Sequence, residues 1–212
     1  MRSEGLSVIS IVFSNEKGGA GKSGSSHLLA LGCAHFEQAA YVLHSDKGAV
    51  PPAEDRPYWI VDAKDPAKCK AAFNKLVSQP GNHWVIVDLP GNEVELDKWI
   101  APVVSMVVLP TNLEEGFVSR TLAHFDMLMK EKGNCWILPR VTGTLNADEA
   151  KQLERITATG RALPTVKHVK KVYKLNETTD QYTTPETVVN NAAKQVYRTI
   201  NNHISRQLIS EG

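Results

Sequence analysis

The sequence predicts an α/β domain of three layers, in which helices cover both faces of a mostly parallel sheet. Apolar segments alternate with amphipathic ones nearly to the end of the chain, which is typical of repeated strand–helix units. Several apolar segments are near-continuous runs of Val, Ile and Leu, as expected of strands that are buried on both faces. The 212 residues are enough for one well-buried domain and too few for two ordinary ones. We therefore expect a single domain over residues 1–212.

Apolar runs and helix start signals predict the individual elements. The predicted strands are 7–13, 40–44, 58–62, 83–88, 103–109, 135–140 and a shorter one at 163–168. The predicted helices are 25–36, 66–77, 113–130, 146–158 and 185–208. Their start signals are Asp65 before Pro66, Asn112 with Glu115, Asn146 with Glu149, and Thr184 before Pro185. Right-handed crossovers would connect the strands.

Composition excludes several classes of protein. The net charge is +1, so binding to nucleic acid would need a local basic patch rather than a global field. The three cysteines are an odd number without a CxxC pair, which favours reduced, buried thiols in a cytosolic protein. No apolar run approaches the roughly 20 residues of a membrane span, and the start of the sequence lacks a signal-peptide layout. We expect a cytoplasmic protein.

A glycine-rich loop between the first strand and the first helix predicts a phosphate-binding site. Its glycines would let backbone N–H groups converge on phosphate oxygens, at the positive end of the following helix. Lys22 would reach the β- and γ-phosphates, and the Ser23 hydroxyl would bind Mg²⁺. The ordinary GxxxxGK[ST] pattern fails at its first position, where Glu16 stands. The predicted nucleotide-binding residues of the loop are Lys17, Gly18, Gly19, Ala20, Gly21, Lys22, Ser23 and Gly24.

A second lysine, Lys17, lies on the other side of the glycines from Lys22. Two ammonium groups about 5 Å apart repel by roughly 3 kcal/mol at an effective dielectric constant near 20. Both can therefore face one site only if a polyanion is bound there, and otherwise one of them points away as a solvated loop lysine. The stretch 17–23 matches the signature KGGxGK[ST] and resembles the deviant Walker A ATPases of the ParA/MinD type.

That resemblance implies a P-loop NTPase fold, ATP and Mg²⁺ as ligands, and a homodimer that forms with ATP. In such a dimer Lys22 would hold the nucleotide of its own chain. Lys17 would cross the interface and contact the phosphates bound by the other subunit.

The fourth predicted strand, 83–88, ends in Asp88, as a Walker B strand does. An acid at the carboxyl end of a strand beside a phosphate loop would hold Mg²⁺, usually through water. The alternative is an aspartate that caps a turn. The following residues 89–91, Leu-Pro-Gly, resemble the switch II turn of the same family.

Two further site residues depend on the resemblance. Family members carry DxDPQ after the second strand, and Asp46 matches the second aspartate, which helps to orient the attacking water. His44 replaces the first aspartate, and Asp46 could instead be a turn residue. Arg140 matches the arginine of a pair that borders the base, although Pro139 replaces its first member. The candidate catalytic residues are thus Lys17, Lys22 and Asp46.

Two surface segments suggest partners. The segment 167–174 contains Lys167, Lys170, Lys171 and Lys174, and it is either a solvated face or a contact to DNA phosphates. The last helix has an apolar stripe from Ala192 to Leu208, which favours packing against the sheet over binding to a membrane surface.

The resemblance implies a small partitioning ATPase of the ParA type. It would dimerise with ATP, bind DNA without sequence preference, associate with the nucleoid, and hydrolyse ATP slowly under stimulation by a ParB-like adaptor. The alternatives are a MinD-like membrane-cycling ATPase and a nucleotide-gated scaffold with little hydrolysis, which His44 keeps open. An iron-protein reductase is set aside, because no cysteine follows the Walker B strand closely.

Overall fold

The computed structural model describes residues 8–45, 50–51, 54–91, 94–131, 133–175 and 182–210. Their seven strands form one sheet in the order β3-β2-β4-β1-β5-β6-β7, and every strand pairing is parallel. The strands are β1 Ile9–Phe13, β2 Ala39–His44, β3 Trp59–Asp62, β4 His83–Asp88, β5 Met106–Asn112, β6 Cys135–Val141 and β7 Val166–Lys167. The helices are α1 Lys22–His35, α2 Pro66–Val77, α3 Val94–Ile100, α4 Glu115–Lys130, α5 Ala147–Thr157, the 3₁₀ helix η1 Lys170–Leu175, and α6 Thr187–Ser210. The predicted three-layer α/β fold is confirmed.

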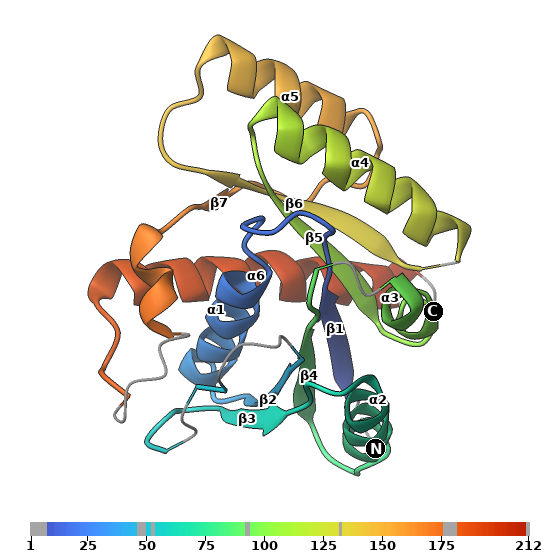
Figure 1. Cartoon of the computed structure of the whole chain (residues 1–212). Coiled ribbons are helices and arrows are strands. Elements are labelled where there is room, and N and C mark those ends of the chain that lie inside the picture. The colour runs from blue at the N-terminus through green and yellow to red at the C-terminus, as the bar shows by residue number, and fades with distance from the viewer. Residues whose placement is uncertain are drawn as a thin grey trace.

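Each face of the sheet has its own apolar cluster. Helices α1 and α6 cover one face, and α2 to α5 cover the other (Figure 1). The interior strand β4 is buried at all six positions, which explains its continuous apolar sequence. No helix in the described ranges has the length and hydropathy needed to cross a bilayer.

The long helix α6 packs closely against α1. Its stripe residues are buried: Ala192, Ala193, Val196, Ile200 and Ile204. On α1, a Cβ added to Gly32 would lie 2.4 Å from the carbonyl oxygen of Ala193, so only glycine allows this approach. These residues pack within the protein as expected, but mainly against α1 rather than directly against the sheet, and the side chain of Leu208 lies outside the described part.

Several predicted boundaries are wrong. Helix α1 begins at Lys22 rather than at residue 25, because the left-handed Gly21 ends the loop and the helix follows at once. Strand β5 begins at Met106 rather than at 103, since Val103 lies in a turn and is 55% exposed. Helix α6 begins at Thr187 rather than at residue 185. The predicted strand 163–168 is reduced to the two residues of β7.

The helix start signals had mixed success. Asp65 caps α2 through the backbone N–H groups of residues 67 and 68, and Asn146 forms a capping box with Glu149. The capping box predicted for Asn112 and Glu115 is absent, because Asn112 still belongs to β5 and the N-cap of α4 is the preceding glutamate, Glu114. Helix α3 and η1 were not predicted.

Candidate nucleotide-binding site

The glycine-rich loop lies at the carboxyl edge of the sheet, at its topological switch point. Strand β1 lies between β4 and β5, and the loop leads from its end into α1 (Figure 1). The chain continues from β1 to one side of the sheet and reaches the other side only with β5. In open α/β sheets such a point is the usual place for a ligand.

The second part of this loop is an open cradle. Gly21 adopts φ 95° and precedes α1, and no side chain among the described residues caps the helix. Its first N–H groups are therefore available to an anion. A Cβ added to Gly18 would meet no atom of the described residues within 4 Å, so these residues leave the loop surface open there. A shallow cavity of about 310 Å³ is lined by Gly18, Gly19, Gly21, Lys22, Ser23, Gly24 and Gly91.

Lys22 connects this cradle to the turn after β4. Its Nζ donates to the carbonyl oxygen of Asn15 at 2.9 Å. A Cβ added to Gly91 would lie 3.6 Å from the same Nζ and 3.2 Å from the carbonyl oxygen of Glu16. The predicted switch II turn thus lies directly against the phosphate loop.

The residues proposed for Mg²⁺ offer the hard oxygen ligands that this cation prefers. Ser23 is half-buried in the first turn of α1, and Asp88 is fully buried at the end of β4. His44 stands opposite Asp88 in the strand register, with its Nδ1 3.8 Å from Oδ2 of Asp88. Asp46 lies outside the described residues, so its predicted role in orienting water stays a prediction.

Arg140 reaches the loop from β6. Its Nη1 donates to the carbonyl oxygen of Ala20 at 2.7 Å, and its Nη2 contacts Nδ1 of His168. A Cβ on Gly21 would lie 1.0 Å from Nη1, so the guanidinium occupies the space beside this glycine. Burial lowers the pKa of Arg140 to about 10, which leaves it charged at neutral pH.

A second cavity of about 200 Å³ lies next to the cradle and shares Gly21 and Gly24 with it. Arg140 and His168 contribute polar groups, and Val166, Val169 and Val172 are among its apolar residues. A largely apolar cavity with a few polar groups has the character of a small-molecule site.

The first part of the loop is anchored to α4. Asn15 is buried, and its Nδ2 donates to the carbonyl oxygen of Pro110 at 3.0 Å and to Oγ1 of Thr121 at 2.8 Å. Its Oδ1 accepts from the backbone N–H of Lys17 at 3.0 Å. Sequence reasoning missed these contacts. The available signal was that Thr121 and His124 are polar residues on the buried side of the predicted helix 113–130.

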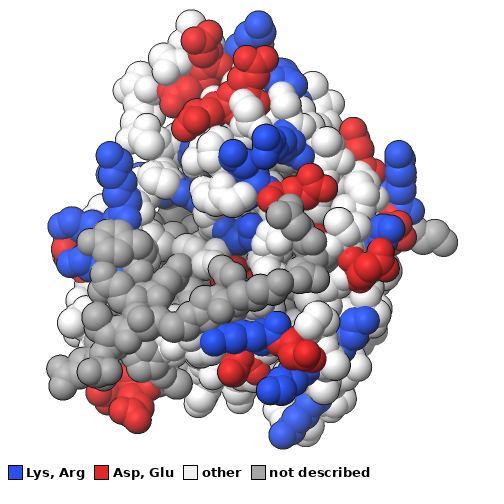
Figure 2. Space-filling model, in the orientation of Figure 1, with Lys and Arg blue, Asp and Glu red and all other residues white. Residues whose placement is uncertain are grey.

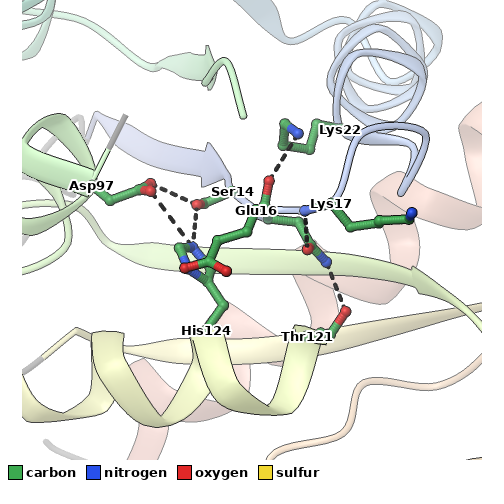
Figure 3. Close-up of polar contacts among 8 residues, drawn as sticks. Ser14, Glu16, Lys17, Lys22, Asp97, Thr121 and His124 are labelled. Atoms are coloured by element: carbon green, nitrogen blue, oxygen red, sulfur yellow. Dashed lines mark hydrogen bonds and ion pairs between the residues drawn. The ribbon is translucent and has the colours of Figure 1, made fainter. Parts of the chain in front are cut away.

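A buried polar cluster lies beside this anchor (Figure 3). The hydroxyl of Ser14 donates to Oδ1 of Asp97 at 2.6 Å, and its Oγ lies 2.8 Å from Nε2 of His124. The other ring nitrogen, Nδ1, lies 3.5 Å from Oε1 of Glu16. The cluster joins the loop to α3 and α4, and none of its members was predicted as a functional residue.

The two loop lysines point in different directions (Figure 3). Nζ of Lys17 lies 5.2 Å from the ring centroid of Phe117 on α4. Lys22 instead contacts the loop backbone. This divergence reduces the repulsion between the two ammonium groups, and contact of Lys17 with a second subunit stays a prediction.

The predicted basic segment is partly neutralised. Lys167 lies on β7 and Lys170 on η1, and both are exposed. Lys171 forms an ion pair with Glu186 at 2.7 Å, and Nζ of Lys174 lies 3.8 Å from the same carboxylate. Figure 2 shows positive and negative side chains interspersed over one face of the protein. Glu186, which lies outside the segment, therefore offsets part of the positive charge of residues 167–174.

Comparison with known structures identifies the fold. A plasmid partition protein from Borrelia burgdorferi, bound to AMPPNP, superposes with a TM-score of 0.66 at 12% identity, covering 93% of this chain and 99% of that chain. A variant of McdA from Cyanothece in complex with ATP gives 0.64 at 13% identity, covering 93% and 98%. The Pyrococcus furiosus cell division ATPase MinD gives 0.64 at 15% identity, covering 92% and 98%. No protein-family model and no curated protein matches the sequence. The chain therefore has the P-loop fold shared by plasmid partition, McdA and MinD proteins.

Proposed function

We propose that this protein is a ParA-like ATPase that dimerises with ATP and positions a cargo with the help of an adaptor. The observation that carries the proposal is the uncapped start of α1 within a glycine cradle, with Lys22 beside it and the buried Asp88 on the neighbouring strand. Solved proteins of the same fold hold AMPPNP or ATP.

Each residue of the cradle would have a distinct task. The N–H groups of the loop and the Lys22 ammonium would bind the phosphates, while Ser23 and Asp88 would hold Mg²⁺. Bound Mg²⁺ would neutralise part of the phosphate charge. Asp46 would orient the attacking water, and Lys22, together with the partner subunit's Lys17, would stabilise charge that develops on the transferred group.

The central test is the oligomeric state of the purified protein. With a non-hydrolysable ATP analogue and Mg²⁺ we expect a dimer, and with ADP a monomer. Lys17→Ala should bind the nucleotide and stay monomeric, whereas Lys75→Ala, which removes an exposed lysine of α2, should dimerise like the wild type. A wild-type protein that stays monomeric when saturated with the analogue would contradict the proposal.

A nucleotide-gated scaffold is the second candidate function. His44 faces Asp88 and stands at the position where the ParA/MinD family has an aspartate. This replacement removes a carboxylate from the proposed hydrolytic site. ATP turnover separates the two functions, because a scaffold would dimerise with ATP and show no measurable phosphate release.

DNA would be the working surface of the proposed dimer, and two basic regions could contact it. The first is Lys170 with Lys171, although Glu186 competes for Lys171. The second is the polar side of α6, where Lys194 and Arg206 line a groove of about 440 Å³. Residues 187–210 include no Asp or Glu, so this side has no acidic group of its own helix.

Charge-reversal variants assign the DNA contact. Lys170→Glu/Lys171→Glu should weaken ATP-dependent DNA binding at least tenfold at low salt and make log Kd depend less steeply on log salt, by about 0.9 per lost phosphate contact. Lys194→Glu/Arg206→Glu is the matched double variant on α6. If only the α6 variant loses binding, the contact lies there, and if both variants bind like the wild type, neither basic region contacts DNA. A wild type that does not bind DNA in the presence of ATP would show that DNA is not the working surface.

A MinD-like membrane function is less well supported. The apolar stripe of α6 is buried against α1, so it would have to leave the core to enter a bilayer. Liposome flotation with ATP tests this alternative.

A further inference from the structure

The hydrogen bonds around His124 determine which of its ring nitrogens carries a hydrogen. The hydroxyl of Ser14 donates its hydrogen to Asp97, so Nε2 of His124 must carry a hydrogen to bond Oγ of Ser14. If the ring is neutral, Nδ1 then has only a lone pair, and this lone pair faces Oε1 of Glu16 at 3.5 Å. A carboxylate and a lone pair cannot form a hydrogen bond. As a carboxylate, Glu16 can therefore hydrogen-bond His124 only when Nδ1 also carries a proton.

The charges that face His124 come from three elements in the described part of the chain. Glu16 belongs to the phosphate loop, Asp97 to α3, and Lys22 to the start of α1. Burial lowers the pKa of His124 below its ordinary value, the Glu16 carboxylate opposes this effect, and the Lys22 ammonium adds to it. The balance between Glu16 and Lys22 thus affects whether the imidazole is protonated.

We propose that His124 is a positioning residue that takes up a proton when a nucleoside triphosphate binds, and that the imidazolium then joins Glu16 of the phosphate loop to Asp97 of α3. This inference rests on the proposed nucleotide site. Phosphates held by Lys22 would offset the positive charge that disfavours the imidazolium. The proton comes from solvent, and both ring nitrogens then donate, Nε2 to Oγ of Ser14 and Nδ1 to Glu16, while the Asp97 carboxylate, 3.6 Å from Nε2, pairs with the charge of the ring.

The position of the cluster gives this proton a structural consequence. Asp97 lies on α3, the first helix after the switch II turn, and Ser14 and Glu16 flank Asn15, whose carbonyl oxygen accepts from Lys22. A charged His124 would therefore hold the loop, α3 and α4 together more firmly when the phosphates are in place. The effect of bound phosphates would thus reach α3 through the hydrogen bonds of His124 rather than through the glycines of the loop.

Proton counting during nucleotide binding tests the proposal. Titration calorimetry with AMPPNP and Mg²⁺, in buffers of different ionisation enthalpy, measures the protons taken up per nucleotide bound. We expect the wild type to take up more protons than His124→Gln. At pH values between the pKa of His124 in the free protein and its pKa in the complex, the difference should approach one proton per nucleotide bound. Over that range the Kd of the wild type should improve severalfold more than that of the variant as the pH falls. A purely structural role for His124 would lower stability and leave the proton count unchanged.

Two more variants keep the test decisive. Glu16→Gln removes the half-exposed carboxylate without disturbing the core, so it covers the case in which His124→Gln fails to fold, and it should also reduce proton uptake. His35→Gln, at the exposed end of α1, should keep the wild-type count. Equal counts for the wild type and Glu16→Gln, or for the wild type and a folded His124→Gln, would overturn the proposal. No binding of AMPPNP by the wild type would instead reject the nucleotide site itself.

Discussion

The two halves of the phosphate loop are built in opposite ways. Residues 18–21 are glycines and an alanine at the open cradle, where Gly19 and Gly21 have positive φ. Residues 14–17 are polar, and their side chains contact α3 and α4. Residues 18–21 leave backbone N–H groups available to a ligand, and residues 14–17 fix the position of residues 18–21. A phosphate site needs both, because exposed N–H groups bind an anion well only if they are held in place.

The largest effect is expected in the anchored half. Asn15→Ala would leave the carbonyl oxygen of Pro110 and the hydroxyl of Thr121 without their donor, and would leave a small cavity. We expect a loss of about 2–3 kcal/mol in the free energy of unfolding, measured in urea. Nucleotide affinity should fall as well, because the backbone N–H of Lys17 loses its acceptor.

A double-mutant cycle with Thr121→Val provides the control. The two substitutions should couple by about 1 kcal/mol, since each removes one side of the same hydrogen bond. Strict additivity of the two losses would show that the anchor does not depend on this bond.

This contrast also explains what could be predicted from the sequence. The open half could be predicted from the sequence, because glycines and a lysine between a strand and a helix form a local pattern. The anchored half was not, since the partners of Ser14 and Asn15 lie 83 to 110 residues away in the chain. The same limit applies to α3, whose seven residues are too few to show a helical period, and to Glu186, whose pairing with Lys171 joins separate segments.

A smaller effect on stability is expected in the open half. Gly21→Ala would place a side chain at φ 95° and displace the Arg140 guanidinium, so we expect a loss of about 1–2 kcal/mol. Nucleotide affinity should fall at least tenfold, as measured with a fluorescent nucleotide. Gly116→Ala is the matched control, because a Cβ there, in the first turn of α4, meets no atom of the described residues within 4 Å, and it should stabilise the protein slightly. A Gly21→Ala protein with normal affinity would show that this conformation is not needed for binding.

The smallest effect is expected for Lys17. Its ammonium group contacts Phe117, which places it in the anchored half of the loop. Its predicted role, however, is to contact the other subunit of the proposed dimer. A half-exposed cation over an aromatic ring contributes about 0.5 kcal/mol. A double-mutant cycle of Lys17→Met and Phe117→Leu, measured by urea unfolding without nucleotide, should therefore show coupling of that size. With a saturating non-hydrolysable ATP analogue the coupling should vanish, because a lysine that contacts the other subunit's phosphates has left the ring. Coupling that persists unchanged with the analogue would mean that Lys17 stays on its own α4, and the two-subunit role would then have to pass to another residue.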